Sequence, residues 1–206
     1  MKTLLALTTG LALAALLVPS AALAVISGSF HDFSGAEWNV TGEICVVCHT
    51  PHNAATIADA PLWNHELSDA AYTPYSSATL NAADVAQPSG VSKLCLSCHD
   101  NTVAVDSFAG ATGTTFIGTL GTPAGRANVG TDLSNDHPIS FTYDTALATA
   151  DGELADPALD SEVADLLFNG QLECASCHDV HNVDDNAYLL RIANTGSALC
   201  LTCHLK

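Results

Sequence analysis

The sequence predicts a mostly irregular fold, with a few short helices, one or two short hairpins and little apolar core of its own. Three observations lead to this prediction. All eight cysteines fall into four Cys-x-x-Cys-His motifs. Only about 180 residues follow an apolar N-terminal leader. Residues 100–150 are rich in Gly, Thr, Ala and Ser and contain none of the motifs, so we expect a long loop there.

The four motifs run from Cys45 to His49, Cys95 to His99, Cys174 to His178 and Cys200 to His204. Cys-x-x-Cys-His is the attachment signal for a c-type haem. Cysteines three residues apart lie on one side of a helical turn, so both thiols can reach the vinyl groups of one porphyrin. The histidine then binds the iron as proximal ligand. Two zinc sites or a set of disulfides would leave the four histidines unexplained.

The sequence therefore predicts four covalently attached haem c groups and a fold with the haems at its core. The attachment cysteines are Cys45, Cys48, Cys95, Cys98, Cys174, Cys177, Cys200 and Cys203. The proximal ligands are His49, His99, His178 and His204. Because so few residues serve each haem, we expect the polypeptide to wrap the haems, with short helices at the motifs.

Residues 1–24 have the features of a secretory signal peptide. Lys2 precedes an apolar run from Leu4 to Val18, and Ala22-Leu23-Ala24 forms a small-residue cleavage site. The run is shorter than a typical membrane-spanning helix, and no later stretch is long and apolar enough to cross a bilayer. We expect an exported protein without a membrane span, located at the outer cell surface or otherwise in the periplasm.

The predicted mature chain is strongly acidic. The full chain has a formal charge of −17, and removal of Lys2 leaves four basic and 22 acidic residues. Nucleic-acid binding requires a basic face, so nucleic acid is excluded as a partner. The acidity also argues against docking through a ring of lysines, and solubility is sufficient to explain it.

Local signals predict a few regular elements. Ser89 is a plausible N-cap for a helix from Val91 to His99. Asn169-Gly170 predicts a hairpin turn that leads into the third motif. Val103 to Val105 is predicted as a short strand, residues 53–88 as loop, and residues 195–204 as a last helix.

An internal repeat divides the chain into two di-haem modules, about 25–107 and 131–206, joined by a Gly/Thr-rich loop in one tetrahaem domain. Cys48-His49-Thr50-Pro51-His52-Asn53 matches Cys177-His178-Asp179-Val180-His181-Asn182. Ser92 to His99 likewise matches Ser197 to His204.

The sixth iron ligands are predicted to be histidines, because the only methionine is Met1 in the leader. The repeat places His31 and His137 before the first motif of each half, and His52 and His181 after it. These four are the predicted distal ligands. His65 has no counterpart in the second half and remains a fifth candidate.

His52 and His181 each follow a proximal histidine by three residues. A ligand so near in sequence cannot reach the opposite face of the same haem, so each must serve another haem. His52, near the mature N-terminus, would bind a haem in cis or in the next subunit, whereas cis ligation suits His181.

The motif regions, with Pro61-Leu62-Trp63-Asn64 and Leu94 to Asp100, resemble the multihaem c-type cytochromes of metal-reducing bacteria. The chain is most similar to tetrahaem outer-surface cytochromes with doubled motifs that polymerise into filaments. The resemblance implies bis-histidine haems, closely spaced porphyrins and extracellular electron transport. It also implies that a histidine of one subunit can ligate a haem of the next, and His52 matches such a position.

The leading functional prediction is an electron-transfer protein and not an enzyme. It would be a subunit of a conductive filament whose partners are other copies, other redox proteins or extracellular electron acceptors. A monomeric periplasmic shuttle is the first alternative. A multihaem reductase is the second, and it would require an iron with an open position. A filament in which the haems serve only folding is a further alternative.

Overall fold

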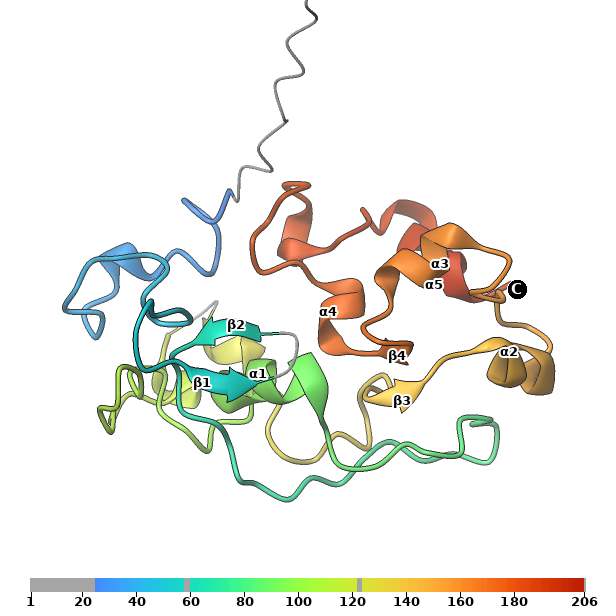
Figure 1. The fold of residues 1–206 in the computed structure, drawn as a ribbon, viewed down its shortest axis with the longest axis horizontal. Coiled ribbons are helices and arrows are strands. Elements are labelled where there is room, and N and C mark those ends of the chain that lie inside the picture. The colour runs from blue at the N-terminus through green and yellow to red at the C-terminus, as the bar shows by residue number, and fades with distance from the viewer. Residues whose placement is uncertain (1–24, 58–59, 122–123, 206) are drawn as a thin grey trace, which may run out of the picture.

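The computed structural model describes residues 25–57, 60–121 and 124–205. The predicted signal peptide, residues 1–24, lies outside the described residues. Most of the described chain is irregular, and its regular elements are short (Figure 1). The helices are α1 (Gly90–His99), α2 (Thr145–Asp151), α3 (Ser161–Leu166), α4 (Cys174–Cys177) and α5 (Ala198–Cys203). The strands are β1 (Ala55–Ile57), β2 (Ala60–Trp63), β3 (Phe141–Thr142) and β4 (Gln171–Leu172).

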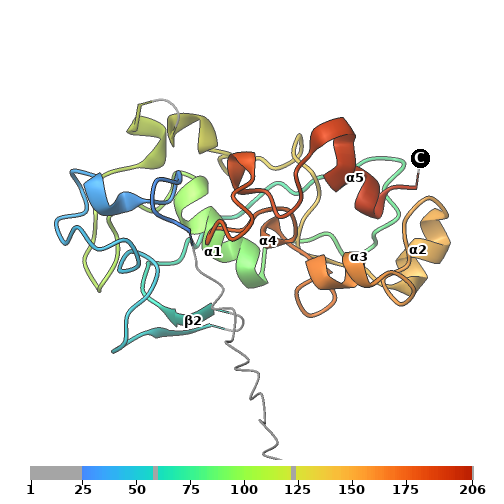
Figure 2. The ribbon, with the colours of Figure 1, turned by 90° about the horizontal axis from the view of Figure 1, so that it is seen from above.

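The predicted irregular fold with few short helices is thus confirmed, whereas a haem core stays a prediction. The molecule is elongated (Figure 1). The β1–β2 hairpin lies towards one end, and α2, α3 and α5 lie towards the other. The segment before α1 runs along the molecule to the α2 end, where the side chain of Asn81 binds that of Asp151. Helices α1 and α4 meet in the middle, as the view from above also shows (Figure 2).

Helix α1 begins where the sequence predicts. Ser89 has extended backbone angles at the N-cap, although its side chain makes no capping hydrogen bond. Val91 and Leu94, three residues apart, pack against Ala60 of the β1–β2 hairpin. This helix carries the whole second motif, so its packing fixes where Cys95, Cys98 and His99 lie.

The turn at Asn169-Gly170 is confirmed. Both residues have positive φ, 51° and 76°, as the two-residue hairpin turn requires. Phe168 and Gln171 exchange two backbone hydrogen bonds of 2.9 Å across it. Strand β4 pairs with β3, which lies far away in sequence. Gln171 is opposite Thr142, and Leu172 is opposite Phe141.

Two local predictions are wrong. Val103 to Val105 forms no strand, because its backbone groups bind scattered partners instead of one ladder. Val105 N–H donates to the Thr115 carbonyl, and the carbonyl of Ala104 accepts from Ser107. Residues 53–88 are not entirely loop, since β1 and β2 pair as an antiparallel hairpin between Ala55 and Trp63.

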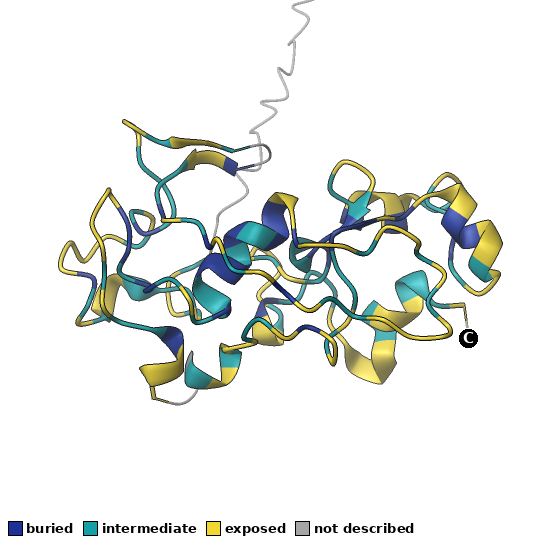
Figure 3. Ribbon diagram, turned by 90° about the horizontal axis from the view of Figure 1, so that it is seen from below, coloured by how far each residue is buried: buried dark blue, intermediate teal, exposed yellow. Residues whose placement is uncertain are grey.

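The buried apolar residues gather in three small clusters and not in one core (Figure 3). The largest lies in the second half, where Phe141, Tyr143 and Val163 are its most buried members. The other two flank α1, around Leu94 and around Leu96. Across residues 25–57, 60–121 and 124–205, no helix has the length and apolar character needed to span a bilayer.

Candidate functional site

Each Cys-x-x-Cys-His motif folds as a helical turn. The backbone N–H of His49, His178 and His204 donates to the carbonyl of the first cysteine of its motif, at 2.8, 3.1 and 2.9 Å. The second motif lies within α1, the third begins with α4 and the fourth lies in α5. Only the first motif is a single turn without an assigned helix. The turn brings both thiols of a motif to one side, as haem attachment requires.

The eight cysteines are all free thiols. Thiols of successive motifs adjoin one another. Burial, followed by the neighbouring Cys48 thiol, raises the pKa of Cys98. A hydrogen bond with Cys174, followed by burial, raises the pKa of Cys95. Burial, followed by Cys177, raises the pKa of Cys203 to about 11. The four motifs therefore lie along the molecule in chain order.

Three of the four predicted proximal histidines have Nδ1 bound to a backbone carbonyl. His49 binds the carbonyl of Pro61 at 2.9 Å, His99 that of Ala127 at 2.7 Å and His178 that of Tyr188 at 3.1 Å. Because the carbonyl is an acceptor, Nδ1 carries the proton and Nε2 keeps its free lone pair. Iron-ligating histidines typically use their second nitrogen in this way.

The backbone segments that bind the imidazoles of His49 and His178 have the same local structure. Thr50 N–H donates to the Leu62 carbonyl, and Asp179 N–H donates to the Leu189 carbonyl. Leu62 and Leu189 both have positive φ, 60° and 58°, which turns the preceding carbonyl toward the histidine ring. Sequence reasoning missed this feature. Its only signal is the leucine shared by the two segments, at spacings from the motif that differ by two residues.

The structure places three predicted distal histidines next to three predicted proximal ones, with ring planes inclined by 55°, 12° and 71°. The centroids of His31 and His99 are 6.1 Å apart, those of His49 and His181 6.2 Å, and those of His137 and His204 6.4 Å. A metal–imidazole bond is about 2 Å long, so two bonds to one iron span about 4 Å. The distance from each bound nitrogen to the centroid of its ring adds about 1 Å on either side. The three spacings therefore fit an iron between each pair.

His31 lies in a setting that favours the metal-binding form. Burial, followed by the neighbouring His99, lowers the pKa of His31 to about 4. The neutral imidazole, which is the form that binds metal, is therefore the stable one at neutral pH. Its Nδ1 is buried without a hydrogen-bond partner.

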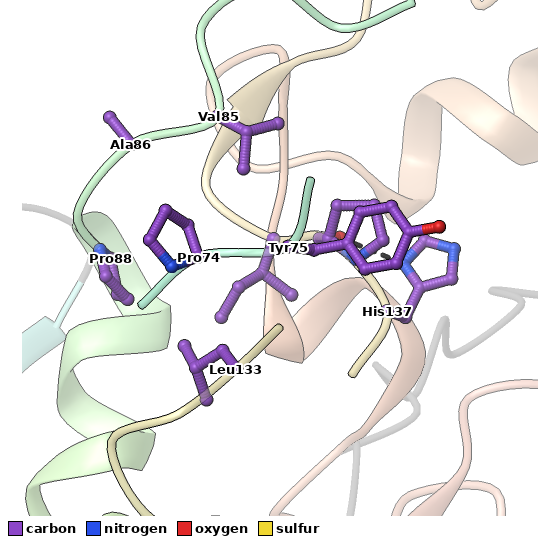
Figure 4. Close-up of a pocket in the computed structure, with 9 residues that line it drawn as sticks. Pro74, Tyr75, Val85, Ala86, Pro88, Leu133 and His137 are labelled. Atoms are coloured by element: carbon purple, nitrogen blue, oxygen red, sulfur yellow. Dashed lines mark hydrogen bonds between the residues drawn. The ribbon is translucent and has the colours of Figure 1, made fainter. Parts of the chain in front are cut away.

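His137 lies beside a small apolar pocket (Figure 4). Tyr75, Pro74 and Val85 line the same pocket. The pocket holds about 10 Å³, room for about one water molecule. His137 Nδ1 binds the carbonyl of Pro138 at 2.9 Å, so this predicted distal ligand also keeps Nε2 free.

His52 and His178 are left without a facing histidine. In the described part of the chain, the His52 imidazole makes no hydrogen bond, ion pair or ring contact, and its loop is exposed. No histidine ring faces His178 there, although its Nδ1 is bound to a carbonyl in the same way as that of His49.

His65 differs from the other histidines. It is buried, with 3% of its surface exposed. Nδ1 lies 2.7 Å from the carbonyl of Glu66, and Nε2 lies 3.1 Å from that of Ala104. Both ring nitrogens therefore lie beside backbone carbonyls, of which the single N–H of a neutral imidazole can bind one, as in a structural histidine.

Residues 167–206 match the family model of the doubled CXXCH motif. The match covers the third and fourth motifs. It supports a multihaem c-type cytochrome involved in electron transfer, with covalently bound haem c at the motifs. No curated protein matches the chain. The internal repeat carries the same doubled pattern into the first half, at Cys45 to His49 and Cys95 to His99.

Proposed function

We propose that the chain is an exported tetrahaem electron-transfer protein whose subunits join head to tail in an extracellular filament. The haems, when attached at the four motifs, supply the electron carriers, and the polypeptide supplies ligands, spacing and insulation. The observation that carries the proposal is the set of three histidine pairs, together with the two predicted ligands outside them, His52 and His178.

The three pairs follow the internal repeat. His31, before the first motif of its half, faces His99 of the second motif of that half. His137 faces His204 in the equivalent way in the second half. We infer that His31 and His137 are the distal ligands of the second and fourth haems.

The third pair connects the two halves. His181, after the first motif of the second half, faces His49 of the first motif of the first half. His52 is the repeat counterpart of His181. By the same relation, it would face the proximal histidine of the first motif in a second half, and that histidine is His178. Because no histidine ring faces His178 in the described part of the chain, we infer that the partner of His52 is His178 of the partner subunit.

Such a contact is heterologous, because different surfaces of two identical subunits meet. It propagates as a filament unless the rotation between subunits closes a ring. His52 lies in an exposed loop, as a ligand donated to a neighbour must. Its partners would be further copies of this chain, and redox proteins or extracellular electron acceptors at the filament ends or surface.

The test is the assembly of His52→Ala, compared with Pro51→Ala, which changes the same exposed loop without removing an imidazole. Electron microscopy should show filaments for the wild type and for Pro51→Ala, and single subunits for His52→Ala. Filaments of normal length from His52→Ala, with an unchanged low-spin spectrum, would rule out this ligand.

One observation favours a second candidate function. A third-motif iron held by His178 alone would keep an open position, which a multihaem reductase requires. A monomer that binds cyanide or nitrite at rest and reduces a small substrate would support the reductase. Six-coordinate low-spin haem throughout the native assembly would support electron transfer alone.

A further inference from the structure

Glu173 is a buried carboxylate at the junction of the two halves. Only 1% of its surface is exposed. It directly precedes Cys174 and is the N-cap of α4, which carries the third motif, and α4 packs against α1, which carries the second. The residues before the other three motifs are Ile44, Leu94 and Leu199, so this charge is unique among the four sites.

The carboxylate is surrounded by hydrogen-bond donors. Oε2 accepts from the hydroxyl of Ser92 and, at 2.8 Å, from that of Ser140. The backbone N–H of Ser176 donates to the same side chain in a capping box. A carboxylate only accepts hydrogen bonds when it is ionised, so three donors suit its charged form.

Glu173 also occupies the N-terminal end of α1, to which it is not connected in sequence. A Cβ atom at Gly90 would lie 2.8 Å from Oε1, so the glycine leaves the space that the carboxylate fills. Ser89 makes no capping bond with its side chain. The positive end of the α1 dipole therefore faces the Glu173 charge and stabilises it.

This charge lies close to two attachment thiols that themselves touch. Cys95 and Cys174 form a hydrogen bond, and the Glu173 charge contributes to the raised pKa of Cys95. Cys95 belongs to the second motif and Cys174 to the third. Groups attached through these two sulfurs would share the field of one buried carboxylate.

We propose that Glu173 is a positioning and electrostatic residue that lowers the reduction potentials of the haems at the second and third motifs. A nearby negative charge favours the ferric form, which carries one more positive charge than the ferrous form. These two haems are then harder to reduce than they would be without the charge. This inference rests on the proposed function, because it requires haem at both motifs.

The test is a redox titration of holoprotein Glu173→Gln, followed by visible absorption and by the NMR signals of the haem methyl groups. Glutamine keeps the shape and removes the charge. Two of the four haems should become easier to reduce by about tenfold in equilibrium constant, which is about 59 mV for one electron. Glu162→Gln, which removes an exposed charge on α3, is the matched control and should leave all four haems within twofold of wild type.

A second variant covers the case in which Glu173→Gln does not assemble. Ser140→Ala keeps the carboxylate and removes one donor, so its charge is less neutralised and the same two haems should become harder to reduce. An unchanged titration, or an equal shift of all four haems, would overturn the proposal. Haem content is measured on the same samples, so that fewer than four haems in the wild type would count against the proposed function instead.

Discussion

His181→Ala should remove one iron ligand with little other damage. The side chain keeps 49% of its surface exposed, so its loss leaves no large cavity. The contact that anchors this loop runs through the backbone, from Val25 N–H to the His181 carbonyl, and survives the substitution. What disappears is the ring beside that of His49, 6.2 Å away and inclined by 12°, and an exposed contact of its Nδ1 with Asp179 at 3.7 Å, which contributes little to stability.

The expected size of the effect follows from the motif count. One haem in four loses its sixth ligand, so about one quarter of the haem should become high-spin. Added imidazole should return that quarter to the low-spin form, because it replaces the missing side chain. Visible absorption and electron paramagnetic resonance measure both steps.

His65→Ala is the matched control, because it removes a histidine that faces no other histidine. It removes the one N–H that the ring donates to a buried carbonyl, while the Ala104 carbonyl keeps the Ser107 N–H, and it should cost about 2–4 kcal/mol of stability. It should leave all four haems low-spin. A His181→Ala protein that stays fully low-spin and binds no imidazole, or a spin change in His65→Ala, would refute the assignment of these ligands.

Two further predictions concern stability. Burial and a hydrogen bond to Asp100 raise the pKa of Tyr72 to about 12, above its usual value near 10. The phenol therefore contributes stability below pH 10 that is lost as pH rises from 10 to 12. Tyr72→Phe should be less stable than wild type by about 1–2 kcal/mol at pH 8, with a difference that shrinks toward pH 12 in chemical unfolding, and a constant difference would contradict this. Asp160 caps α3 by accepting from Glu162 N–H at 2.9 Å, so Asp160→Ala should cost about 1 kcal/mol. The neighbouring Glu162→Ala, which keeps the cap, should stay within about 0.5 kcal/mol, and an equal loss in both would exclude the cap as the cause.

Local sequence signals predicted local structure best. Ser89 and Asn169-Gly170 act through their own backbone preferences, so α1 and the turn before β4 lie where expected. The pairing of β4 with β3 joins residues about 30 positions apart and has no local signal. The strand predicted at Val103 to Val105 failed for the same reason, because an apolar pattern cannot show that the partner strand is missing.

The candidate site was predictable in its residue types but not in its pairs. The motifs predict the cysteines and proximal histidines directly, and the repeat predicts His31, His52, His137 and His181 as distal ligands. Which histidine faces which depends on the packing of the two halves. His181 therefore meets His49 across the molecule, a contact that no spacing in the sequence predicts.

The most direct test of the central claim is a cryo-electron microscopy map of the native exported protein with its haems attached. We expect a filament with four porphyrins in each subunit. The irons would lie between His31 and His99, His49 and His181, and His137 and His204, and the His178 iron would be bound by His52 of the partner subunit. Separate monomers, or a different histidine on the His178 iron, would contradict it.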